Sequence, residues 1–193
     1  MEGASEIARD AALQTAARVN LPELMRQPGF AGLQHYWMTP WFDRVRFGRW
    51  DEITAEANPA PDLPYATAIW HYAQAMAALR QGRADDAAKH YEALRALAAD
   101  PVMETMKVWD RYPLAHAANI AERTVNAELA LARGDQAAAI AALAEAVTIE
   151  DRIPYDEPPG WHSPVRQSLG AALLVAGRAA DAAKVYREEL SRN

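Results

Sequence analysis

The sequence predicts an all-helical protein built from stacked helical hairpins. Alanine supplies 44 of the 193 residues, against nine glycines, and alanine is the strongest helix former among the amino acids. Apolar helical runs that end at a glycine and are followed by another helical run recur four times along the chain. The length fits one domain of four to five helical repeats and excludes two large domains.

The repeated element is a glycine turn between two helices. It occurs at Gly48-Arg49-Trp50-Asp51, Gly82-Arg83-Ala84-Asp85, Gly134-Asp135-Gln136-Ala137 and Gly177-Arg178-Ala179-Ala180. Seven residues before each glycine stand Trp41, Ala75, Ala127 and Gly170; five residues after stand Ile53, Ala87, Ala139 and Ala182; nine residues after stand Ala57, Tyr91, Leu143 and Tyr186. Small residues at these offsets let two antiparallel helices approach closely, and a larger residue one turn later fills the gap toward the next pair. Each unit is therefore predicted to be a helix–turn–helix.

The units follow one another in a defined order along one domain, residues 1–193. We expect a half repeat at about 1–20, followed by repeats at about 31–59, 64–100, 113–150 and 163–193. The turn glycines are 34, 52 and 43 residues apart, so residues are inserted twice, at about 101–113 and 150–164. These insertions are rich in proline, and we expect them to be loops or short extra helices. In the half repeat, only the second helix of a unit is present.

These offsets resemble the consensus of tetratricopeptide repeats. The stretches HYWMTPWFDRVRFGRWDEI, LPYATAIWHYA and YDEPPGWHSPVRQSLGAALLVAGRAADAAKVYREELSRN resemble a family of bacterial tetratricopeptide-repeat proteins. The likeness covers nearly the whole chain and is clearest in the last unit, whereas the first unit departs by placing Trp41 and Ile53 at small positions. It implies a right-handed superhelical solenoid of antiparallel helix pairs. Because further repeats precede and follow these segments in that family, it also implies a fragment of a longer array.

Charge and hydropathy argue against nucleic acid and membrane as partners. Acidic residues outnumber basic ones 26 to 20, for a net charge of -6, which disfavours a phosphate-binding surface. The uncharged stretch Leu169–Gly177 has nine residues, about half of the ~20 that span a bilayer. Residues 1–20 contain three acids and no apolar core of a signal peptide, so we expect a cytoplasmic protein.

The sequence contains few of the residues and motifs that are typical of catalytic sites. The chain has no cysteine, which excludes disulfides, thiolate metal sites and cysteine nucleophiles. Its five histidines are isolated rather than paired one helical turn apart, and no nucleophile elbow of the G-x-S-x-G kind occurs. We therefore expect no metal, no cofactor and no enzymatic activity.

Partner-binding residues are expected on the first helix of each pair, since these helices line the concave side of a solenoid. The groove candidates on these helices are polar, aromatic or methionine residues: His35, Met38, Phe42, Tyr72, Met76, Arg123, Asn126, Glu128, Arg166 and Gln167. Met38, Phe42, Tyr72 and Met76 occupy the positions where some tetratricopeptide domains carry a carboxylate-gripping Lys and Asn. They predict instead an apolar or aromatic groove for a peptide or protein segment, and hence a non-catalytic interaction module. The alternative for each ring is packing between repeats.

The segment Tyr155–His162 is the densest group of functional residue types, with Tyr155, Glu157, Trp161 and His162 as candidates. Three interpretations stay open. It is an inter-repeat loop stiffened by Pro158 and Pro159, a ligand-contacting loop, or a hydrolase-like site whose carboxylates lie between aromatic rings.

Self-association through the ends of the stack is a further alternative. Val185 and Leu190 form an apolar strip on the last predicted helix, and Ile7, Leu13 and Val19 form one on the first. A repeat stack needs polar outer faces at both ends to stay monomeric, so uncovered strips would bind another copy.

Overall fold

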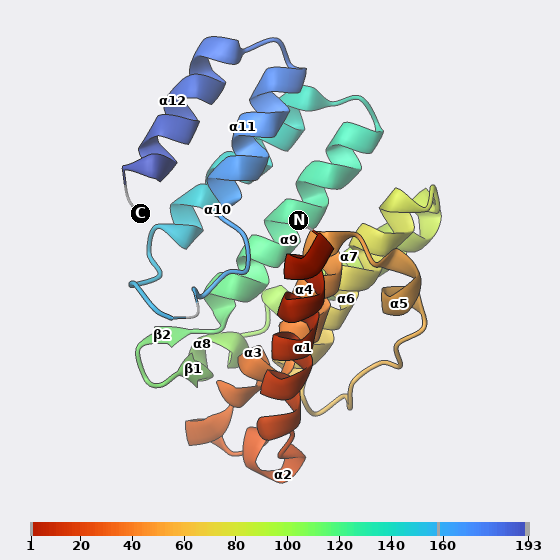
Figure 1. Cartoon of the computed structure of the whole chain (residues 1–193), viewed down its shortest axis with the longest axis vertical. Helices are drawn as coiled ribbons and strands as arrows, with labels where there is room; N and C mark the ends of the chain where they lie inside the picture. Colours follow the sequence, from red (N-terminus) through yellow and green to blue (C-terminus); the bar gives the residue numbers. More distant parts are fainter. Residues whose placement is uncertain (1, 158, 192–193) are drawn as a thin grey trace.

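The chain folds as a stack of helices. The computed structural model describes residues 2–157 and 159–191; Met1, Pro158, Arg192 and Asn193, which belong to the predicted segments 1–20, 150–164 and 163–193, lie outside the described residues. Figure 1 shows the helices arranged along the long axis, from the N-terminal helices in the lower half to α12 at the top. The predicted all-helical class is confirmed.

The elements are mostly helices, joined in one place by a short ribbon of two strands. In chain order they are α1 (Glu2–Arg18), α2 (Pro22–Met25), the 3-10 turn η1 (Pro28–Phe30), α3 (Leu33–Trp37), α4 (Thr39–Phe47), α5 (Trp50–Thr54), α6 (Pro64–Arg80), α7 (Ala84–Ala98), α8 (Val102–Thr105), β1 (Lys107–Val108), β2 (Tyr112–Pro113), α9 (Ala115–Ala132), α10 (Gln136–Glu150), α11 (Val165–Val175) and α12 (Ala179–Leu190).

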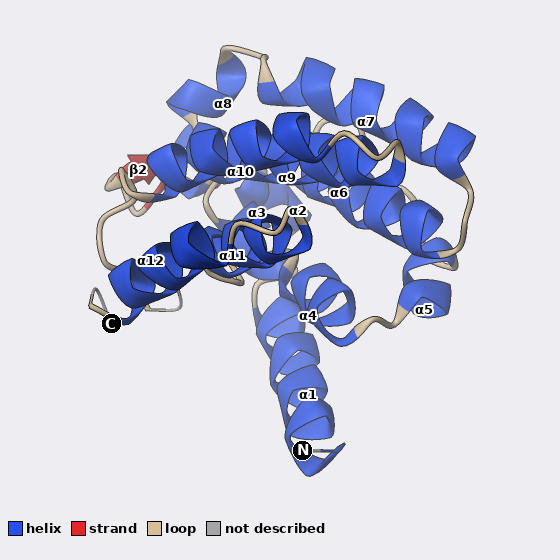
Figure 2. Cartoon of the chain, turned by 90° about the horizontal axis from the view of Figure 1, so that it is seen from above, coloured by secondary structure: helices blue, strands red, loops and turns tan. Residues whose placement is uncertain are grey.

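Neighbouring helices pair in chain order. The pairs α6–α7, α9–α10 and α11–α12 pack closely, and α7 and α10 also contact the first helix of the pair that follows. The shorter pair α4–α5 packs against α6, while α1 lies against α3 and α4. Figure 2, seen from above, shows α1 beside α4 and pointing away from the pairs α6–α7, α9–α10 and α11–α12. Each layer of the stack therefore buries the apolar face of the layer before it.

The four turn glycines adopt the same backbone geometry. Gly48, Gly82, Gly134 and Gly177 have φ of 70°, 74°, 79° and 73°, a left-handed conformation that glycine reaches without steric cost. The residue after each glycine donates its N–H to the carbonyl five residues earlier, at 2.8 to 2.9 Å. The glycine N–H in turn donates to the carbonyl three residues before it. Together the two bonds form the Schellman motif that ends a helix. The same turn is thus built four times, where the glycines predict it.

Packing around the turns follows the predicted offsets. The residues five places after the glycines, Ile53, Ala87, Ala139 and Ala182, are all fully buried. In the last pair, a Cβ built on Gly170 would overlap the Tyr186 ring at Cζ. The Tyr186 ring therefore lies directly against the glycine, which is the close approach expected from a small residue opposite a large one.

The first insertion contains β structure that the sequence did not predict. Besides the short α8 it holds an antiparallel ribbon in which Lys107 pairs with Pro113 and Val108 with Tyr112. Trp109 and Asp110 turn the ribbon with positive φ. Val108 is fully buried and fixes the ribbon to the core.

Both ends of the stack carry exposed apolar side chains. Ile7 and Leu13 on α1 are exposed, as is Leu190 on α12, whereas Val19 and Val185 are half-buried. Across the described ranges, no helix combines the length and apolar character needed to cross a membrane.

Candidate functional site

The second insertion folds back over the first helices of the pairs. We call residues 151–157 and 159–163 the inner loop. Its Asp156 carboxylate accepts a hydrogen bond from the Tyr112 hydroxyl at 3.0 Å and pairs with Arg111 at 2.8 Å. Gly160 lies so close to Ile153 that an added Cβ would be 2.8 Å from its Cγ2. The β ribbon thus holds one side of the loop, and α11 begins directly after the other.

Trp161 and His162 form the tip of the inner loop, Trp161 buried and His162 half-buried. Trp161 is 5% exposed and makes edge-to-face contacts with Phe42 and Tyr72, with ring centroids 5.5 and 5.3 Å apart. The His162 ring stacks on Phe42 at 4.9 Å and 16°, and its Nε2 lies 3.1 Å from the Tyr72 hydroxyl. Burial lowers the pKa of His162 to about 3, with the nearby Arg46 acting in the same direction, so the ring is neutral at pH 7.

This tip covers most of the groove expected in the front half. Phe42 and Tyr72 are buried beneath Trp161 and His162, and Met76 is buried beside them. Met38 is fully buried in the core, so it does not line a groove. Counting helical positions locates a face of a helix, but the chain's own loop covers that face here.

His35 is also buried rather than available to a partner. Its Nδ1 lies 2.7 Å from the Tyr65 hydroxyl, and it is 6% exposed. Burial lowers the pKa of His35 to about 4. His35 therefore contributes a neutral ring to the core and to the edge of the cavity described next.

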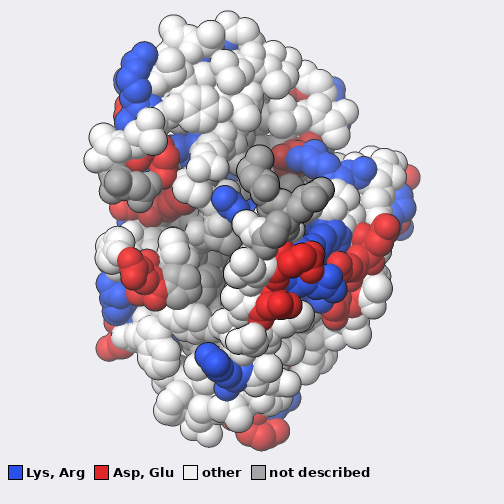
Figure 3. Space-filling view, in the orientation of Figure 1, with Lys and Arg blue, Asp and Glu red and all other residues white. Residues whose placement is uncertain are grey.

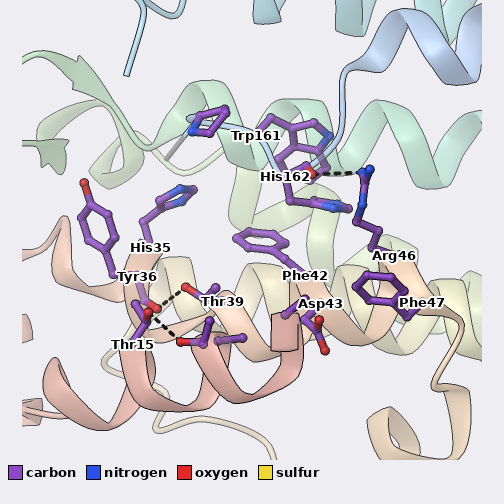
Figure 4. A pocket seen from close by; sticks show the side chains of 14 residues that line it. Thr15, His35, Tyr36, Thr39, Phe42, Asp43, Arg46, Phe47, Trp161 and His162 are labelled. Carbon is purple, nitrogen blue, oxygen red and sulfur yellow. Dashed lines mark hydrogen bonds between the residues drawn. The ribbon is translucent and has the colours of Figure 1, made fainter. Parts of the chain in front are cut away.

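A cavity of about 550 Å³ lies between α1, α4 and the inner loop; we call it the α1 cavity. Figure 4 shows its residues: Phe42 and the His162 ring lie next to each other, and Arg46 reaches from α4 to His162. The Arg46 guanidinium donates to the His162 carbonyl at 3.5 Å. Aromatic rings form much of the wall, since Tyr36, Phe47 and Trp161 line it as well.

A second cavity, of about 470 Å³, lies where the first helices of the pairs converge; we call it the inner cavity. Its lining comes from α4, α5, α6, α9, α11 and the inner loop, and includes Tyr72, Met76, Arg80, Thr124, Glu128 and Gln167. Glu128 pairs with Arg80 at 2.9 Å. Both cavities are bordered by Arg46, Phe47, Trp161 and His162, so they meet at the Arg46–His162 contact.

The remaining groove candidates are divided among different environments. Arg123 pairs with Glu122 and with Glu145 of α10, both at 2.9 Å, so its charge is engaged toward the second helix of its own pair. Arg166 is 5% exposed and binds both carboxylate oxygens of Asp151, at 2.7 and 2.8 Å. It therefore acts as a structural cation. Asn126 is half-buried on α9.

The loop carboxylates do not form the opposed pair that a hydrolase-like site needs. Asp156 is engaged with Arg111 and Tyr112, while Tyr155 and Glu157 are exposed and hydrogen-bonded to each other. Glu128 faces the inner cavity, away from the Asp156 contacts. Glu150, at the end of α10, accepts the Val165 N–H at 3.0 Å, and burial raises its pKa to about 7.

Several of these features carry no signal in the sequence. The alanines of α1 that wall one cavity are ordinary helix residues in the sequence, and the anchors Arg111 and Tyr112 lie 44 or more residues before their partner Asp156. His71 and His90 meet across the α6–α7 pair with Nδ1 atoms 2.9 Å apart. Among the described residues, no group of three or more His, Asp or Glu side chains could hold a metal ion.

Comparison with known proteins gives no relative: no family model, curated protein or solved structure matches the chain. Function is therefore inferred from the geometry of the two cavities.

Proposed function

We propose that the chain is a tetratricopeptide-like helical-repeat module that binds an extended peptide segment of a protein partner in the inner cavity. The observation that carries this proposal is that the first helices of all four pairs, α4, α6, α9 and α11, contribute side chains to one cavity. Convergence of successive first helices on a common surface is how solenoid repeats build a binding face. The four equivalent Schellman turns support the repeat architecture.

The positions expected to face a groove converge on this cavity. Ten and six residues before the turn glycines stand eight residues, and five of them line it: Tyr72, Met76, Thr124, Glu128 and Gln167. The lining mixes an apolar patch around Met76, the Arg80–Glu128 ion pair and the polar side chains of α11. Such a surface suits a peptide, because backbone amides can bond to the polar groups while one apolar side chain packs on Met76.

The charge distribution supports a protein partner over nucleic acid. On the face of the molecule drawn in Figure 3, acidic and basic side chains are interspersed, without an extended basic surface. Together with the net charge of -6, this favours binding without phosphate contacts. We place this module in the cytoplasm, with no cofactor.

A peptide-display selection tests the proposal. Random peptides selected on the wild-type chain are remeasured on Gln167→Trp, which fills the inner cavity from α11, and on the matched control Gln136→Trp, whose site is exposed at the start of α10. We expect enriched peptides to lose at least tenfold in affinity on Gln167→Trp and to keep their affinity on Gln136→Trp. Absence of enrichment, or equal loss on both variants, would overturn the proposal.

A further inference from the structure

The α1 cavity is large enough for a small molecule, and short side chains on α1 leave it open. At about 550 Å³ it falls within the range of pockets that enclose compact ligands. The space exists because α1 presents Ala8, Ala11 and Ala12 to it, opposite the rings of Phe42 and Trp161. Their spacing places these alanines on one face of the helix, and side chains this short cannot reach the facing rings.

The walls favour a flat, apolar ligand body. Phe42, Trp161 and the neutral His162 ring lie on one side of the cavity, and the alanine face of α1 lies on the other. Stacked and edge-on contacts with aromatic rings stabilise an aromatic ligand beyond the burial of its area alone. A slot between rings and alanines therefore selects a planar group.

The charges at the rim favour an anion. Among the described residues lining the cavity, the only Lys or Arg is Arg46 and the only acid is Asp43. Asp43 is held by Arg49 at 2.6 Å and points away from the His162 ring in Figure 4. Arg46 is exposed, and its bond to the His162 carbonyl is 3.5 Å long, at the limit of a hydrogen bond. Its guanidinium fork is therefore available for a carboxylate.

We propose that the α1 cavity is a binding site for a compact aromatic carboxylate, with the ring between the alanine face of α1 and Phe42–Trp161 and the carboxylate on Arg46. Both parts of such a ligand find a partner: the ring replaces water against apolar walls, and the carboxylate gains a charge-assisted bidentate contact. The alanine wall borders the α1 cavity and not the inner cavity, whereas Arg46 and Trp161 border both.

The proposal is tested by isothermal titration calorimetry with two probes of equal shape, 2-naphthoate and its neutral analogue 2-naphthamide. We expect 2-naphthoate to saturate the wild-type chain in the micromolar range and 2-naphthamide to bind at least tenfold more weakly. Arg46→Gln should remove the difference between the probes. Ala11→Phe, which places a ring in the cavity from its exposed α1 position, should abolish binding of both.

Two control variants distinguish binding in the α1 cavity from binding elsewhere on the chain. Arg187→Gln makes the same charge change on an exposed position of α12 and should leave both affinities unchanged. Gln167→Trp, which blocks the inner cavity, should also leave 2-naphthoate binding unchanged, so the two proposals fail separately. Circular dichroism confirms that each variant is folded. Equal affinity for the two probes, or 2-naphthoate binding that survives Arg46→Gln or Ala11→Phe, would overturn the proposal.

Discussion

Replacing Trp161 with alanine should destabilise the whole chain, although the residue lies in a loop. The side chain is 5% exposed and contacts Phe42 and Tyr72. Truncating a buried tryptophan to alanine costs about 3–5 kcal/mol through lost burial and the cavity left behind. The loop cannot collapse into that cavity, because Asp156 is fixed to Arg111 and Tyr112.

Urea unfolding followed by circular dichroism measures this change without depending on tryptophan fluorescence. We expect the melting temperature to fall by about 10 °C as well, given the usual conversion for a chain of this size. The matched control is Tyr155→Ala, in the same loop but 79% exposed, which should change stability by less than about 0.5 kcal/mol. A loss below about 1 kcal/mol for Trp161→Ala would refute the claim that the loop is part of the core.

Three further predictions concern packing and pH. Gly170→Ala should cost about 1–3 kcal/mol by overpacking against Tyr186, and a double-mutant cycle with Tyr186→Ala should recover most of it; no coupling would contradict the close approach. Because burial lowers the pKa of His35 to about 4, the unfolded chain binds a proton more readily between pH 6.5 and 4. The free energy of unfolding should therefore fall as the pH is lowered through that window, by up to about 3 kcal/mol from this residue. In urea titrations at several pH values, His35→Gln should make the free energy of unfolding depend less steeply on pH. Glu150 should change stability with pH in the opposite direction, because burial raises its pKa to about 7. Relative to Glu150→Gln, the wild type should lose stability as the pH rises from about 4.5 to 7. Parallel curves of stability against pH for the two proteins would contradict this.

The helix pairs and their glycine turns could be predicted because local residues determine them. A glycine at each turn supplies a left-handed conformation, and the residue five places later is buried in every unit. Gly170 also contacts the Tyr186 ring, as their positions before and after the turn glycine predict. These relations involve residues within one hairpin, where helical periodicity fixes which side chains face each other.

The candidate site was harder to predict because its contacts join distant segments. Offsets from the turn glycines located the side of α6 and α9 that faces the inner cavity, but they carry no information on what covers that side. Trp161 and His162 cover Phe42 from a loop more than a hundred residues later. The ion pairs that engage Arg123 and Arg166 depend equally on where the neighbouring helix lies. Helical position alone therefore overestimated how many aromatic and charged residues are free to bind a partner.

The most direct test of the central proposal is a crystal structure of the chain with a peptide selected by display. The proposal predicts an extended peptide in the inner cavity, in contact with Met76 of α6, Glu128 of α9 and Gln167 of α11. A peptide bound to the second helices α7 and α10, or at either end of the stack, would contradict it.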